Sequence, residues 1–109
     1  MRFHCETVRK GGVLQLRMRG SLDGSSAWEV RHLLDSEEAD EVVLDMQGLV
    51  EVWDFGAAVL AAGLRQLEVG RLRILHAAPE LEDWLDRFAV VAEISAGAEF
   101  GMRSGHLRV

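Results

Sequence analysis

Apolar and polar residues alternate along two segments at the start of the chain, residues 1–8 and 13–19. In the second segment, leucines and a methionine at even positions alternate with glutamine and arginines at odd positions. A period of two is typical of β-strands that bury one face. The pair Gly11–Gly12 lies between the segments and favours a tight turn. The pattern therefore predicts a β-hairpin at the N-terminus.

Three later segments carry apolar residues at helical spacing. The first is expected to begin near Ser26, where Ser26 and Glu29 match a capping box. The second runs from about Phe55 to Glu68, with Gly70 where a helix-ending glycine is expected. The third begins at Pro79, a residue favoured in the first helical turn. Its apolar stripe consists of Leu81, Trp84, Leu85 and Phe88.

Short apolar strands are expected between and after these helices, at Glu41–Met46, Leu72–Ala77 and Val90–Ile94. Alternating strands and helices favour an α/β fold in which right-handed crossovers join parallel strands. We therefore predict a single domain over residues 1–109, with a mixed sheet of about five strands, an antiparallel N-terminal strand and three or four helices. Residues 96–109 are expected to form a C-terminal tail or a short terminal element.

Charge and composition narrow the possible partners and compartments. The formal net charge of −6 argues against nucleic acid or anionic membranes as partners. Cys5 is the single cysteine, so no internal disulfide is possible, which fits a reducing compartment. No apolar run approaches the ~20 residues of a membrane helix, and the first residues lack the apolar segment of a signal peptide. We therefore expect a cytoplasmic protein. Five carboxylates within residues 35–41 predict an exposed connector.

The strongest functional signal lies between Leu44 and Leu60, in the sequence LDMQGLVEVWDFGAAVL. We expect a strand to end at Asp45–Met46, a loop to turn at Gly48, and the sequence Trp53–Gly56 to open a helix. A helix start presents unpaired backbone N–H groups and the positive end of the helix dipole. Such a place suits a carboxylate, a phosphate or a hydroxyl that can be phosphorylated.

This stretch resembles the STAS family, which is named for sulfate transporters and anti-sigma factor antagonists. The family pattern is a strand ending in Asp-Leu, a glycine-centred loop, and Asp-Ser-Ser-Gly or Asp-Ser-Phe-Gly at a helix start. Asp45, Gly48 and Gly56 align with this pattern without a gap, and Gly20–Asp23 looks like the family's Gly-x-Leu-Asp turn. The resemblance covers about residues 8–95.

Two positions depart from the family pattern, and they bear on switching. The family's phosphoacceptor serine falls on Asp54, and the acidic residue before it falls on Trp53. The resemblance therefore implies a domain that has no phosphoacceptor here and is not switched by phosphorylation at residue 54. The carboxylate of Asp54 is expected either to imitate the phosphorylated state or to cap the helix as its N-cap residue. Trp53 either anchors an interface or packs locally on Phe55 or Val50.

Catalytic and metal chemistry have little support in the sequence. The four histidines are scattered without ligand spacing, and no Ser-His-Asp grouping occurs. Asp45, Glu51 and Asp54 could be a carboxylate cluster for a cation, but their side chains need not converge. We expect no catalytic residues, no cofactor and no metal site, and place a small hydrolase last among the possible functions.

By resemblance, the chain is expected to be a non-enzymatic regulatory domain of bacterial signal transduction and transcription control. It would dock onto an anti-sigma factor or a related histidine-kinase-like switch protein and so free what that regulator holds. The expected partner-binding residues are Ser21, Asp23, Trp53, Asp54, Phe55 and Gly56. The alternative is a STAS-type accessory subunit or a domain that senses a small ligand or nucleotide. The oligomeric state and the identity of the partner stay open.

Overall fold

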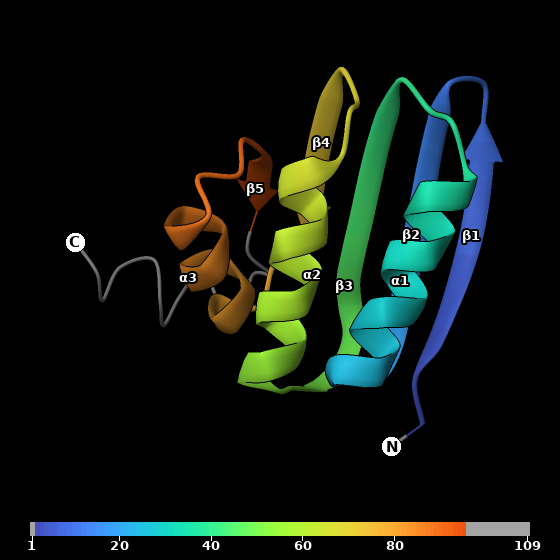
Figure 1. The fold of residues 1–109 in the computed structure, drawn as a ribbon. Coiled ribbons are helices and arrows are strands. Elements are labelled where there is room, and N and C mark those ends of the chain that lie inside the picture. The colour runs from blue at the N-terminus through green and yellow to red at the C-terminus, as the bar shows by residue number, and fades with distance from the viewer. Residues whose placement is uncertain (1, 96–109) are drawn as a thin grey trace.

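The chain alternates strands and helices as its apolar pattern predicts (Figure 1). The structure, a computed structural model, describes residues 2–95. In chain order the elements are β1 (His4–Lys10), β2 (Val13–Leu22), α1 (Gly24–Ser36), β3 (Glu41–Val52), α2 (Asp54–Gln66), β4 (Arg71–Leu75), α3 (Pro79–Arg87) and β5 (Glu93–Ser95). The tail expected at residues 96–109 lies outside the described residues.

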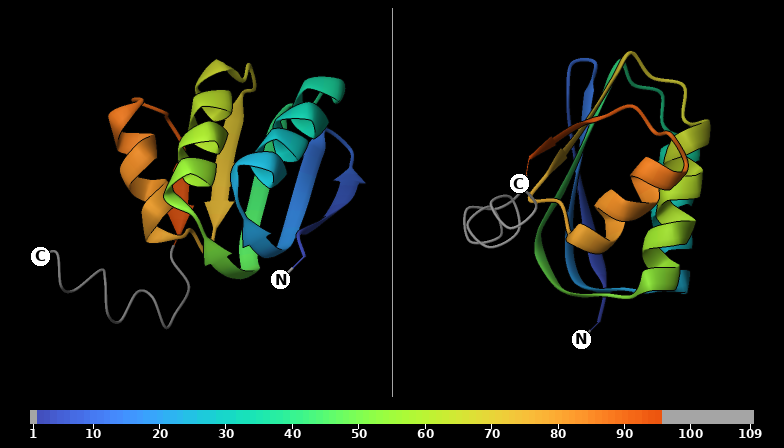
Figure 2. Two further views of the ribbon diagram at one scale, coloured as in Figure 1. Left: turned by 60° about the horizontal axis from the view of Figure 1, so that its bottom comes forward. Right: turned by 90° about the vertical axis from the view of Figure 1, so that its left-hand side faces the viewer.

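The five strands form one sheet in the order β1-β2-β3-β4-β5. β1 pairs with β2 in the antiparallel sense, and the other neighbours are parallel. All three helices cover the same face of the sheet, as the right-hand view of Figure 2 shows. The predicted mixed sheet with an antiparallel N-terminal strand and the three helices are therefore confirmed. The predicted turn at Gly11–Gly12 is also confirmed, with Gly11 at a φ of 61°.

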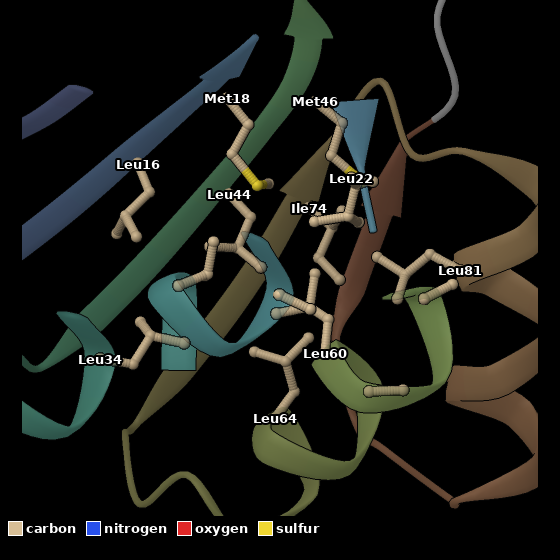
Figure 3. Packing of buried hydrophobic residues seen from close by; sticks show 14 of the residues in the cluster. Leu16, Met18, Leu22, Leu34, Leu44, Met46, Leu60, Leu64, Ile74 and Leu81 are labelled. Atoms are coloured by element: carbon tan, nitrogen blue, oxygen red, sulfur yellow. The ribbon is translucent and has the colours of Figure 1, made fainter. Parts of the chain in front are cut away.

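The core lies between the sheet and the helices (Figure 3). Leu16, Leu44 and Ile74 stand in register across β2, β3 and β4, and all three are fully buried. Leu60 of α2 and Leu81 of α3 close the other side of this layer and are equally buried. Because α1 and α2 pack on the same layer of leucines, the ends of the strands and the starts of these helices are held at fixed positions.

The third strand is longer than predicted. The sequence suggested an end at Asp45–Met46 and a loop at Gly48, but β3 continues to Val52. The pairing with β2 shifts register between Arg17 and Arg19 and again between Gly20 and Ser21. Such irregularities bend a strand and increase its twist. A Cβ at Gly48 would lie 2.7 Å from the carbonyl oxygen of Met18, so glycine serves close strand approach there rather than a turn.

Two helix boundaries also differ from the prediction. α1 begins at Gly24, two residues before Ser26, because its N-cap residue is Asp23. α2 ends at Gln66, and Gly70 is not its cap. Instead the Gly70 N–H donates a hydrogen bond of 3.0 Å to the carbonyl oxygen of Asp40, at the start of β4. The last strand, expected at Val90–Ile94, is the shorter β5.

The acidic connector before β3 is mostly exposed, as predicted, although α1 extends into it as far as Ser36. Arg9 of β1 forms an ion pair of 2.9 Å with Glu37, which ties the connector to the edge of the sheet. Among residues 2–95, no helix is long and apolar enough to cross a membrane.

Candidate functional site

Two strand ends and two helix starts meet at one end of the sheet, the lower end in Figure 1. β2 leads into α1 through Asp23, and β3 leads into α2 through Trp53. The backbone N–H of Trp53 donates a hydrogen bond of 2.9 Å to the carbonyl oxygen of Leu22, which joins the two connections. We call residues 21–23 and 53–56 the corner. Both segments supplied the expected partner-binding residues, and the structure brings them into contact.

Glycines allow the two halves of the corner to touch. A Cβ at Gly56 would lie 2.7 Å from the carbonyl carbon and oxygen of Asp23, a distance that real Cβ atoms do not adopt. A Cβ at Gly24 would lie 2.9 Å from Cε2 of Phe55, so the phenyl ring covers the first residue of α1. The first turn of α2 therefore packs directly on the backbone between β2 and α1.

Asp23 caps α1 and sets its starting point. Its Oδ1 accepts a hydrogen bond of 2.9 Å from the backbone N–H of Ser26, and the Ser26 hydroxyl oxygen accepts one of 2.7 Å from the backbone N–H of Asp23. The capping box is thus Asp23–Ser26, and the predicted box of Ser26 with Glu29 is wrong. Ser26 is nearly fully buried, because it serves as the third helical residue of the box and not as the cap.

The same hydrogen bonds favour the ionised carboxylate of Asp23. The backbone N–H of Ser26, and then the hydroxyls of Ser26 and Ser25, hold the pKa of Asp23 below its ordinary value of 3.8. A carboxylate whose pKa is lowered by folding stabilises the folded state above its unfolded pKa. That contribution is lost as the pH falls through the folded pKa.

Asp23→Ala is therefore expected to lower the midpoint of thermal unfolding at pH 7, and the deficit is expected to shrink as the pH falls below 3.8. Asp23→Asn is the matched control, because asparagine caps helices nearly as well as aspartate but does not titrate. Thermal unfolding followed by circular dichroism between pH 2 and pH 7 measures both variants. A deficit of Asp23→Ala that stays constant over this range would contradict the assignment.

Trp53 and Phe55 present large apolar side chains to solvent at the corner. Their exposed fractions are 55% and 69%, and Val50 near the end of β3 is 65% exposed. Trp53 occupies the N-cap position of α2 but makes no side-chain capping bond. More than half of Trp53 is exposed, so its indole is not packed into the core.

The six predicted partner-binding residues fall into an exposed and a buried group. Asp23, Trp53, Asp54 and Phe55 are exposed, whereas Ser21 and Gly56 are buried. The Ser21 hydroxyl donates a hydrogen bond of 3.0 Å to Oε1 of Glu51, which links β2 to β3. Ser21 and Gly56 therefore shape the corner from within, and the four exposed residues form its surface.

Asp54 is not the N-cap residue that the sequence suggested. It is the first residue of α2, where a carboxylate is favoured by the positive end of the helix dipole. Its Oδ1 accepts a hydrogen bond of 2.8 Å from Nε1 of Trp84 in α3. The sequence pattern placed Trp84 in the apolar stripe of α3 and did not predict this contact. Its only signal in the sequence is that a buried indole N–H usually finds a hydrogen-bond acceptor.

The carboxylates considered for a cation point to different partners. Glu51 binds Ser21, Asp54 binds Trp84, and Asp45 accepts a hydrogen bond of 3.0 Å from the backbone N–H of Gln47. In the part of the chain that the structure describes, no group of three or more potential ligands could hold a metal ion. Open hollows of about 410, 550 and 710 Å³ are lined by residues outside the corner.

Cys5 is a poor candidate for a nucleophile. Burial raises the pKa of its thiol to about 11, and the negative charge of Glu29 adds to the shift. The thiolate, which is the reactive form, is therefore scarce at neutral pH. The arrangement at the corner, a rigid backbone with exposed aromatic rings and carboxylates, suits contact with another protein better than covalent chemistry.

The comparisons with known proteins agree with this architecture. The model of the STAS domain family matches residues 4–101. This range extends at both ends beyond residues 8–95, over which the sequence motifs indicated the resemblance. The structure of the anti-sigma factor antagonist SpoIIAA in its unphosphorylated form is similar, with a TM-score of 0.60 and 17% identity, over 99% of this chain and 100% of that chain. No curated protein matches the chain.

Two further solved structures share the fold. A Ser-to-Glu variant of RsbS from Moorella thermoacetica has a TM-score of 0.54 and 16% identity, over 96% of this chain and 98% of that chain. An uncharacterised protein from Shewanella loihica with a SpoIIAA-like fold has a TM-score of 0.54 and 20% identity, over 88% of this chain and 86% of that chain. At these identities the likeness concerns the fold alone.

Proposed function

The chain belongs to the STAS domain family, and on this premise we propose that it is a non-enzymatic regulatory domain that docks onto an anti-sigma factor or a related histidine-kinase-like switch protein. The observation that carries the proposal is the exposure of Trp53 and Phe55 on a rigid corner. The similarity in fold to SpoIIAA, an anti-sigma factor antagonist, supports the class of partner.

Two exposed aromatic rings at the start of one helix, Trp53 at the N-cap position and Phe55 in the first turn, are suited to anchoring an interface. Tryptophan is enriched among the residues that contribute most to protein–protein binding, because its large surface is desolvated when it enters a pocket. The backbone beneath the rings is held by the hydrogen bond from Trp53 to Leu22 and by the close packing of Gly56. Little conformational entropy is therefore lost when a partner binds.

In this proposal the domain acts by competition. It occupies the regulator through the corner and so releases the protein that the regulator would otherwise hold. Trp53 and Phe55 supply affinity, and the exposed carboxylate of Asp23 orients the partner by its charge. A nucleotide sensor is disfavoured at this place, because the exposed carboxylates of Asp23, Glu51 and Asp54 would repel phosphate groups.

The absence of a hydroxyl at residue 54 leads to a prediction about switching. A purified anti-sigma kinase of the source organism is expected to bind the domain, and ATP is not expected to release it, since Asp54 offers no hydroxyl for phosphorylation. Asp54→Ser is expected to restore release by ATP where the kinase tolerates the neighbouring Trp53. Isothermal titration calorimetry and mass spectrometry with and without ATP measure affinity and phosphate together.

Two results would contradict the proposal. One is that purified kinases of this class are tested in turn and none of them binds the domain. The other is stoichiometric, ATP-dependent phosphate on wild-type Asp54. A thermal shift assay with nucleotides serves as the control for ligand sensing, because a ligand that binds the native state raises the melting temperature.

A further inference from the structure

The hydrogen bond between Asp54 and Trp84 connects the corner to a helix that no sequence motif implicates. Oδ1 of Asp54 and Nε1 of Trp84 are 2.8 Å apart, although the residues are separated by 30 positions in the chain. The contact joins the first residue of α2 to the middle of α3, two helices that lie side by side in Figures 1 and 2.

We propose that Trp84 is a positioning residue of the corner, which holds Asp54 and thereby fixes α3 against the start of α2. The carboxylate of Asp54 then acts as an acceptor within the domain, and it is neither a helix cap nor a free charge that imitates a phosphate. This inference rests on the proposed function, because it takes the corner to be the docking surface.

The chemistry of the two groups fits this role. An indole N–H can only donate and has a single hydrogen, so its direction selects one acceptor. A carboxylate is a strong acceptor, and hydrogen bonds to ionised groups are stronger than those between neutral groups. The Trp84 ring is also oriented from its own helix, because it stacks on Phe88 at 5.7 Å between ring centroids, and the guanidinium of Arg87 lies 4.7 Å from the ring centre. The donor is therefore preorganised.

α3 is a helix that depends on contacts of this kind. It has nine residues, and its N-cap residue, Ala78, makes no side-chain capping bond. The residues His76 before it and Ala89 after it have positive φ angles of 55° and 56°, a region that is unfavourable for residues other than glycine. Leu81 and Leu85 bury one side of the helix, and Trp84 supplies a polar connection to α2.

A double-mutant cycle on the domain alone tests the contact. Asp54→Ala and Trp84→Phe remove the acceptor and the donor, respectively, and each is expected to lower the urea midpoint of unfolding by about 0.5 M. The double variant is expected to lower it by no more than the larger single shift, because either change already breaks the same bond. Shifts of the two single variants that add in the double variant would overturn the proposal.

Asp54→Asn is the matched control, since its amide oxygen can still accept from the indole. NMR of the indole N–H, assigned by its disappearance in Trp84→Phe, is expected to show a shifted and slowly exchanging signal in the wild type. The signal is expected to stay protected in Asp54→Asn and to become that of an exposed indole in Asp54→Ala. An indole signal that does not respond to Asp54→Ala would overturn the proposal as well.

Binding measurements test whether the partner contacts the charge of Asp54. With a kinase that binds the wild type, Trp84→Phe is expected to weaken affinity about 10-fold through a displaced corner, and Asp54→Asn is expected to weaken it less, because its amide oxygen keeps the contact with the indole. A larger loss of affinity in Asp54→Asn than in Trp84→Phe, with an unchanged indole signal, would show that the partner contacts the charge directly and would overturn the role assigned to Asp54. The cycle and the NMR measurement need no partner, so their outcome stands whether or not docking is found.

Discussion

Trp53→Ala is expected to weaken binding to the partner by at least about 30-fold, which corresponds to about 2 kcal/mol, while the free energy of unfolding changes little. The side chain is 55% exposed, makes no capping bond and follows the last residue of β3. Its removal therefore takes little from the core. In a complex, however, the indole would be among the most completely desolvated groups, and its loss would leave an unfilled pocket on the partner.

Chemical denaturation and calorimetric binding, measured on the same preparation, separate the two roles of Trp53. Val91→Ala is the matched control, because Val91 is 92% exposed and lies before β5, outside the corner. That variant is expected to bind as the wild type does. If Trp53→Ala instead loses about 3–5 kcal/mol of folding free energy, as a core aromatic would, and keeps its affinity, then Trp53 is structural and the corner is not the docking surface.

Gly56→Ala is expected to lower the free energy of unfolding by about 1–3 kcal/mol, as overpacking of a close contact does. The new methyl group would lie 2.7 Å from the carbonyl carbon and oxygen of Asp23. Both atoms belong to backbone that is fixed by the capping box of α1, so relief requires that α2 move away from β2. The same displacement is expected to reduce affinity for the partner, because it moves Trp53 and Phe55.

Gly63→Ala, in the same helix, provides the contrast. There the new methyl group would meet side-chain atoms of Arg31 at 2.7 Å, and a side chain yields more easily than backbone. Alanine is also favoured over glycine in a helix interior by about 0.5–1 kcal/mol, so this variant is expected to lower the free energy of unfolding clearly less than Gly56→Ala does. Urea denaturation compares the two, and equal effects of both substitutions would refute the assigned packing of the corner.

The order of strands and helices could be predicted because the spacing of apolar residues within each segment indicates whether it is a strand or a helix. The alternation in β2 and the helical stripe of α3 are properties of neighbouring residues, which any sequence displays directly. The far end of β3 was not predictable in this way. Gly48 carries the ordinary signal of a turn, and only the shifted pairing with β2 shows that it lies within a strand.

At the corner, the local pattern indicated the two strand-to-helix connections but not how several of their residues act. Asp23 and Ser26 are both good capping residues, and their shared box is recognised only once α1 is seen to begin at Gly24. The partner of Asp54 was missed because Trp84 lies 30 positions away on another helix. Contacts between distant elements have no local period, so a fold is needed to find them.

The most direct measurement of the central claim is the footprint of the bound partner, obtained by NMR on the isotopically labelled domain with and without a kinase that binds it. Backbone amide and indole signals are expected to change at Asp23, at Trp53–Gly56 and along the first turn of α2. Signals from Arg17 and Arg73 on the uncovered face of the sheet are expected to stay as they are. A footprint on that face, with an unchanged Trp53 indole, would contradict the assignment of the corner as the docking surface.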